Sequence, residues 1–162
     1  MNSKAPLILI GLAILLTVTF IFHNSLTVSV VSNAESNAIA DTVKPVMDPG
    51  SRITTRTFRA LIRKAAHVTE FAALGAGLTA MGLILVRGSW KRLRSHICAP
   101  LFAVLMVAVL DEFIQSFTGR TSCLKDVLID FGGGLIGLAV TAVIWAILRK
   151  RTRKAKGDGL TV

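Results

Sequence analysis

The sequence has few of the residues that cross-link or solubilise small domains: two cysteines and nine acidic residues among 162. Two cysteines are too few for a disulfide framework. Cys98 and Cys123 flank an apolar run, and a helix between them would hold them roughly 30 Å or more apart, at about 1.5 Å per residue. We therefore expect both thiols to be free and neither to belong to a metal-binding pair.

The scarcity of acidic residues leaves nine Asp and Glu against 19 Lys and Arg, a formal net charge of +10. Such an excess is typical of nucleic-acid-binding proteins when it forms a patch on a soluble domain. Here the basic groups at 87–94 and 149–156 begin where hydrophobic runs stop, which is the pattern of cytoplasmic membrane flanks. We therefore predict that the lipid bilayer is a partner and that nucleic acid is not.

Hydrophobic residues make up 52% of the chain and gather in four long runs. A helix that spans a bilayer needs about 20 such residues. The pattern predicts an all-α, polytopic membrane domain over residues 1–148, a bundle of about four transmembrane helices. A basic cytoplasmic tail, predicted to be disordered, follows over 149–162. The predicted spans are 6–23, 65–86, 97–117 and 127–148.

The first run has two interpretations. It could be a signal peptide, with Ser32-Asn33-Ala34 as a small-x-small cleavage site. The run is long for a signal core, and its distance from that site is also long, so we favour a retained helix. The polar segment 24–57 that follows contains turn formers and is predicted to be a connection, with a short helix near 34–42.

The basic residues also predict the orientation. With four spans, the N-terminus, the 87–96 loop and the tail share one side, which carries 11 basic residues and one acidic residue. The other side and its membrane edge carry eight basic and eight acidic residues. The positive-inside rule then places both termini in the cytoplasm.

The ionisable residues beside the apolar runs gather at three predicted helix ends on the side opposite the termini. A charge at bilayer depth costs at least about 2.5 kcal/mol, so these groups need partners there. We interpret them as one ligand-binding or functional cluster. Its predicted members are Lys64, His67, Glu70, Asp111, Glu112, Gln115, Arg120, Asp126 and Asp130.

Helical spacing indicates how these side chains point. Lys64, His67 and Glu70 follow at i, i+3 and i+6, which puts them on one stripe of the second predicted helix. On the third, Glu112 is turned about 100° away from Asp111.

Glycines follow the polar residues on two of these helices. Gly75 lies beyond Glu70 on the second run, and Gly133 and Gly137 give a GxxxG spacing on the fourth. Small residues at this spacing let membrane helices approach closely. We predict close helix packing beside the cluster.

Two segments resemble the signatures of the VanZ-like family. The first is RKAAHVTEF (residues 63–71), followed by Leu74-Gly75, and the second is DEFIQSFTGR (residues 111–120), followed by Asp126-Val127. The resemblance covers about residues 7–148. Asp130, Phe71 and Thr118 stand where the family more often has Asn, Tyr and Pro.

The resemblance implies a membrane protein of the bacterial cell envelope. The family is named for a protein associated with low-level resistance to the glycopeptide teicoplanin, a drug that acts outside the cytoplasmic membrane. The resemblance therefore implies where the protein acts and which drug-resistance phenotype it is associated with, but it implies no particular reaction.

Four roles for the cluster remain open from the residues. In the first, Arg120, Lys64 and Lys125 hold a phosphate or carboxylate of an envelope precursor or glycopeptide through charge-assisted hydrogen bonds. In the second, the ion pairs only fasten the helices together.

The third role is an enzyme that acts on a lipid-linked substrate. His67, oriented by Glu70 or Asp111, would be the general base. Nucleophiles suggested by proximity alone are Ser116, Ser122 and Cys123.

The fourth role is metal binding by mixed nitrogen and oxygen ligands, which suit zinc or manganese. Nearby Arg and Lys would repel a cation, so we expect no metal and no other cofactor. The residues considered are His67, Glu70, Asp111, Glu112 and Asp126.

Overall fold

The protein is built from six helices over the part of the chain that the computed structural model describes, residues 4–26, 29–50, 52–86, 88–118 and 123–158. Within these ranges the side chains of 29–36 and 153–158 are not described. The helices are α1 (Lys4–Leu26), α2 (Ser29–Met47), α3 (Thr55–Leu85), α4 (Trp90–Ser95), α5 (Cys98–Ser116) and α6 (Leu124–Asp158).

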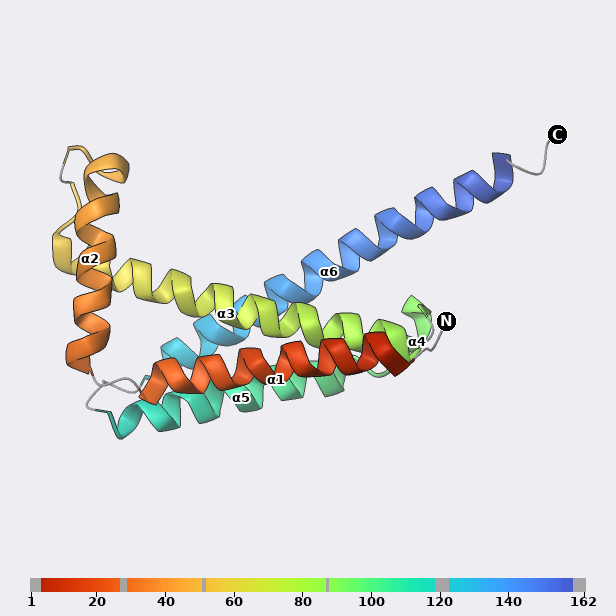
Figure 1. Ribbon diagram of the computed structural model, residues 1–162, viewed down its shortest axis with the longest axis horizontal. Coiled ribbons are helices and arrows are strands. Elements are labelled where there is room, and N and C mark those ends of the chain that lie inside the picture. Colours follow the sequence, from red (N-terminus) through yellow and green to blue (C-terminus); the bar gives the residue numbers. More distant parts are fainter. Residues whose placement is uncertain (1–3, 27–28, 51, 87, 119–122, 159–162) are drawn as a thin grey trace.

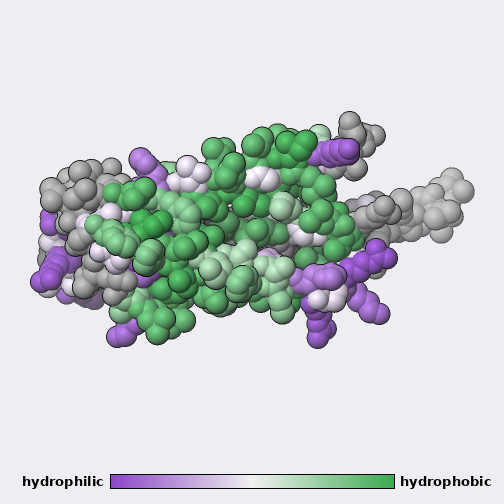
Figure 2. Space-filling model, turned by 90° about the horizontal axis from the view of Figure 1, so that it is seen from below, coloured by the Kyte–Doolittle hydropathy of each residue, from purple (hydrophilic) through white to green (hydrophobic). Residues whose placement is uncertain are grey.

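Four of these helices, α1, α3, α5 and α6, are long and apolar enough to cross a membrane. Many of their large apolar side chains point outward, among them Leu16, Phe102 and Val143. Apolar side chains cover the middle of the face in Figure 2, and hydrophilic residues lie toward its two ends. A surface of this kind suits contact with lipid. The prediction of an all-α polytopic membrane protein is confirmed.

The bundle has two opposite ends, and different helix termini lie at each of them (Figure 1). The N-terminal end of α1, α4 and the C-terminal part of α6 lie at one end. The C-terminal ends of α1 and α5 and the start of α6 lie at the other, where α2 also lies. The free cysteines, Cys98 and Cys123, are exposed and stand at opposite ends of this arrangement.

The core joins all four long helices, so none of them packs as an appendage. Its buried apolar members are few, as expected of a bundle whose apolar surface faces lipid. They are Ile21 on α1, Phe71 and Leu74 on α3, Val104 and Ala108 on α5, and Val127 on α6.

The closest helix pair is α3 with α6, and glycines make it possible. A Cβ atom placed on Gly75 would overlap the backbone of Gly134, and one placed on Gly137 would overlap the carbonyl of Ala72. At Gly133 the added Cβ would lie 2.6 Å from the carbonyl oxygen of Val68. The predicted packing through glycine is therefore confirmed.

Three helices extend further than the sequence suggested. α3 begins at Thr55, ten residues before its predicted span, after Thr54 accepts a hydrogen bond from the Thr57 N–H (3.2 Å). α2 covers 19 residues where we expected a shorter helix. α6 continues to Asp158 through the segment expected to be a disordered tail. Apolar runs mark where a helix crosses lipid, while Lys-, Arg- and Ala-rich flanks also favour helix and continue it into water.

The turn between α2 and α3 is held by one carboxylate. Asp48 accepts hydrogen bonds from the backbone N–H groups of Arg52 (2.9 Å) and Ile53 (2.8 Å). The Ile53 N–H bond, together with the Arg52 N–H and the nearby Lys44, lowers the pKa of this carboxyl from its ordinary value of 3.8.

We expect Asp48→Ala to loosen this turn, because both backbone donors lose their acceptor. Trypsin should then cleave after Arg52 severalfold faster in detergent-solubilised protein. Asp41→Ala, which removes only an exposed 3.7 Å ion pair with Arg59, should leave the rate nearly unchanged. Because folding lowers the pKa of Asp48, its contribution is present at neutral pH and is lost as the pH falls below that ordinary value. Amide exchange at Ile53 as a function of pH would measure this.

Candidate functional site: a polar cluster where four helices meet

The centre of the site is Asp111 on α5, which is fully buried. Its Oδ1 accepts a hydrogen bond from the Ser25 hydroxyl of α1, and its Oδ2 accepts one from Gln115 Nε2 (2.7 Å), one turn further along α5. His67 Nδ1 of α3 lies 3.8 Å from Oδ2. One carboxylate therefore connects three transmembrane helices.

Asp130 brings in the fourth helix, α6. It is only 3% exposed. One potential ligand atom from each of His67, Asp111 and Asp130 lies within 4.8 Å of the other two. Two carboxylates and an imidazole from three helices thus face one small volume.

Glu70 extends the cluster along α3. Its Oε1 accepts a hydrogen bond from Asn24 Nδ2 of α1 (2.8 Å). We define the polar cluster as Asn24, Ser25, His67, Glu70, Asp111, Gln115 and Asp130.

Sequence reasoning missed Asn24 and Ser25, because it considered three helix ends and left the first helix open to removal. The end of α1 is in fact the fourth end at the site. The available signal was a pair of small polar residues directly after an apolar run. In this structure α1 contributes Asn24 and Ser25 to the site itself.

Glu112 lies apart from the polar cluster. It is 5% exposed, and its Oε1 accepts a hydrogen bond from the Cys123 backbone N–H (2.5 Å), just before α6 begins. Its Oε2 has no hydrogen-bond partner among the described residues. Glu112 therefore fastens the end of α5 to the start of α6.

Lys64 and Asp126 form an ion pair of 2.5 Å between α3 and α6, with both side chains more than a third exposed. Exposed pairs of this kind contribute at most about 1 kcal/mol. The three residues of the predicted stripe on α3 therefore lie in two places. Lys64 lies at the rim, while His67 and Glu70 belong to the polar cluster.

Arg120, which we placed in the cluster, lies outside the described residues, as does Ser122. Lys125 is exposed. Thr118 donates to the backbone oxygens of Gln115 (3.0 Å) or Ser25 (3.2 Å), so the end of α5 is closed against α1.

The described side chains of the cluster are rich in acceptors. Glu70, Asp111 and Asp130 supply three carboxylates, while the Lys64 ammonium is engaged at the rim by Asp126. A site of this composition favours cations and hydrogen-bond donors over anions.

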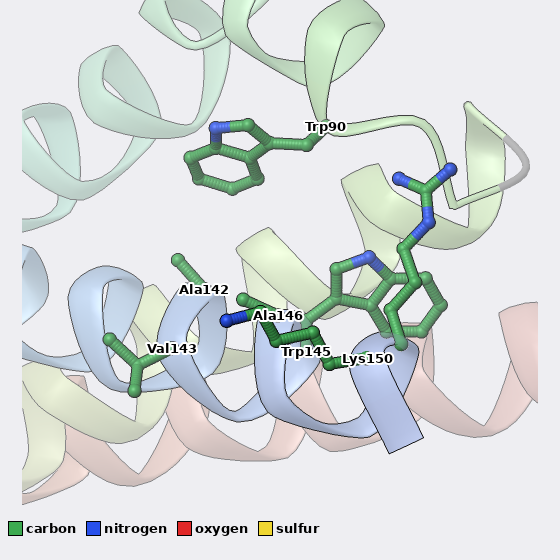
Figure 3. Close-up of a pocket in the computed structure, with 7 residues that line it drawn as sticks. Trp90, Ala142, Val143, Trp145, Ala146 and Lys150 are labelled. Carbon is green, nitrogen blue, oxygen red and sulfur yellow. The ribbon is translucent and has the colours of Figure 1, made fainter. Parts of the chain in front are cut away.

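A separate pocket of about 460 Å³ lies at the opposite end of the bundle. In Figure 3 Trp90 lies across this space from α6, whose side chains, including Trp145, form its other wall. It contains no carboxylate, and its position and composition fit the aromatic and basic belt of a membrane interface. It is lined by Trp90, Ala142, Val143, Trp145, Ala146, Arg149 and Lys150.

Comparison with known proteins gives one match. A family model described as VanZ/LLP1 matches residues 8–147, a range that contains every residue of the polar cluster. No curated protein and no solved structure matches the chain. The family match confirms the resemblance seen in residues 63–71 and 111–120.

Proposed function

The chain belongs to the VanZ/LLP1 family, and from this we propose that its polar cluster acts at the outer face of the bacterial cytoplasmic membrane. There it binds a component of the cell envelope and affects susceptibility to glycopeptides such as teicoplanin. Both termini are cytoplasmic in this proposal.

The distribution of basic residues supports this orientation. α4 and the basic part of α6 lie at the same end of the bundle as the N-terminus (Figure 1). The positive-inside rule favours the cytoplasm for that end. The polar cluster lies toward the other end. Its central residue, Asp111, stands about five residues before the end of α5, which is roughly 7 Å along the helix axis.

The observation that carries the proposal is the buried network around Asp111. Ser25, Gln115 and His67 approach its carboxylate from three helices within a bundle that has an apolar exterior. Ionisable groups inside a membrane domain are costly and generally mark a function. The network also lies next to Asp130, a carboxylate with no hydrogen bond or ion pair among the described side chains.

The charge of the cluster restricts the ligand. The sequence suggested that Arg120, Lys64 and Lys125 could hold a phosphate or carboxylate. Lys64 is paired with Asp126, Lys125 is exposed, and Arg120 lies outside the described residues. The carboxylates instead suit hydrogen-bond donors, such as the sugar hydroxyls and amide N–H groups of a lipid-linked envelope precursor.

Drug susceptibility tests this proposal. Wild-type protein produced in a susceptible bacterium should change the inhibitory concentration of teicoplanin. Glu70→Gln and Asp130→Asn, each of nearly unchanged size, should return it to the level of the empty vector. Asp126→Asn, a carboxylate one turn from Asp130 but outside the cluster, should behave as wild type. Equal membrane insertion must be shown for all variants, and a wild-type phenotype in both cluster variants would refute the proposal.

A second function has one observation in its favour. His67 Nδ1 lies 3.8 Å from Asp111 Oδ2. In this function His67 is the general base and Asp111 orients it, and the distance between them would shorten when the substrate binds. Of the proposed nucleophiles, Ser116 is exposed and donates to the Phe113 carbonyl, and Cys123 is exposed. The third, Ser122, lies outside the described residues. In a hydrolysis at this site water would be the nucleophile. Turnover of a lipid-linked precursor that is abolished by His67→Gln would favour this function over binding alone.

A further inference from the structure

We propose that His67, Asp111 and Asp130 form a binding site for a divalent transition metal ion of the zinc and manganese class. The three residues come from α3, α5 and α6 and present potential ligand atoms within 4.8 Å of one another. The inference deepens the proposed function, because it concerns the same polar cluster.

The ligand set fits this class of ion. One imidazole nitrogen and two carboxylate oxygens are ligands that zinc and manganese accept. Metal–ligand bonds to these atoms are about 2.0–2.2 Å long. A bound ion would therefore draw each side chain inward by about an ångström, which rotation about side-chain bonds can supply.

Asp130 is the independent observation that points to a ligand. Its side chain is more than nine-tenths buried and turned toward His67 and Asp111. No hydrogen bond or ion pair joins it to another residue in the described part of the chain. Buried carboxylates are normally paired or bound to a metal, because an isolated one is costly.

Two hydrogen bonds orient the Asp111 carboxylate, as is usual for a metal ligand. Ser25 donates to Oδ1 and Gln115 donates to Oδ2, so the carboxylate is fixed before an ion arrives. Such outer partners orient ligands, and their loss lowers metal affinity about 10–100-fold.

The charges that face this site favour a cation. Glu70 lies one turn beyond His67 on the same helix and adds a third carboxylate to the cluster. From the sequence we expected nearby Arg and Lys to repel a metal. Of these, Lys64 points to the rim and pairs with Asp126, and Arg120 lies outside the described residues. A bound cation would also let this acidic cluster receive the anionic group of an envelope precursor.

Metal content tests the inference without any drug assay. Protein purified in detergent, with Cys98→Ser and Cys123→Ser to remove exposed thiols, is incubated with Zn²⁺ or Mn²⁺, desalted and measured by mass spectrometry. We expect about one ion per chain, as for a single site of this kind. Asp130→Asn and His67→Gln should abolish binding, Ser25→Ala should weaken it about 10–100-fold, and Asp41→Asn, at an exposed carboxylate of α2, should leave it unchanged.

A second measurement covers the case in which the ligand variants do not fold. The chain has three histidines, and His23 and His96 are exposed. In His23→Gln/His96→Gln protein loaded with Mn²⁺, pulsed EPR should still detect a directly bound histidine nitrogen, which is then that of His67. Absence of bound metal, absence of this nitrogen, or equal binding by folded Asp130→Asn protein would each overturn the inference. A metal-free protein that still alters teicoplanin susceptibility would leave the proposed function standing.

Discussion

Gly137→Ala is expected to separate α3 from α6 and to destabilise the bundle by about 1–3 kcal/mol. The added methyl group would overlap the backbone carbonyl group of Ala72, which cannot rotate away as a side chain could. Alanine is the better helix former by about 1 kcal/mol. The overlap should outweigh that gain, because it is relieved only by moving a whole helix.

Gly132→Ala is the matched control for this prediction. It makes the same substitution on the same helix, but no atom beyond the backbone of its own helical turns and its chain neighbours lies within 4 Å of the added Cβ. It should therefore be neutral or stabilise the protein by up to about 1 kcal/mol. SDS titration in mixed micelles, followed by tryptophan fluorescence, measures both. Equal stability of the two variants would show that glycine is not needed for the α3–α6 contact.

The spans and most of the polar cluster could be predicted because both depend on strong local constraints. A run of about 20 apolar residues has few alternatives to a membrane helix. Because polar and charged side chains are costly inside a bilayer, residues such as His67, Asp111 and Asp130 can be recognised in the sequence as candidates for a function. Helical spacing also predicted that Glu112 turns away from Asp111, and the structure shows it bonded to the Cys123 N–H instead.

The partners of these residues could not be predicted, because they depend on how each helix is rotated in the bundle. α1 is apolar on all sides, so its sequence does not show which face is inside, and Asn24 and Ser25 were overlooked. Lys64 lies on the same stripe as His67, yet the crossing of α3 and α6 brings Asp126 to it at the rim. The extension of α3 from Thr55 is too polar to give a hydropathy signal, and it begins at a local cap, Thr54.

Asp111→Ala and Asp111→Asn should separate packing from chemistry at the centre of the cluster. Alanine removes the acceptor of Ser25 and Gln115 and leaves buried donors without partners, which costs about 1–3 kcal/mol per group. Ser25 can turn to a carbonyl of its own helix. We therefore expect Asp111→Ala to lose about 1–3 kcal/mol in SDS titration, mostly through Gln115.

Asparagine keeps the shape and most of the hydrogen bonds at this position. Its carbonyl oxygen can accept from Gln115, and its NH₂ can donate to the Ser25 oxygen, so the loss should stay within about 1 kcal/mol. What it removes is the negative charge opposite His67. A stable Asp111→Asn protein that no longer alters teicoplanin susceptibility would therefore show that the charge is needed for function. If that variant keeps full function and only Asp111→Ala fails, Asp111 serves to fasten α1 to α5, because hydrogen bonds alone then account for its presence in the membrane.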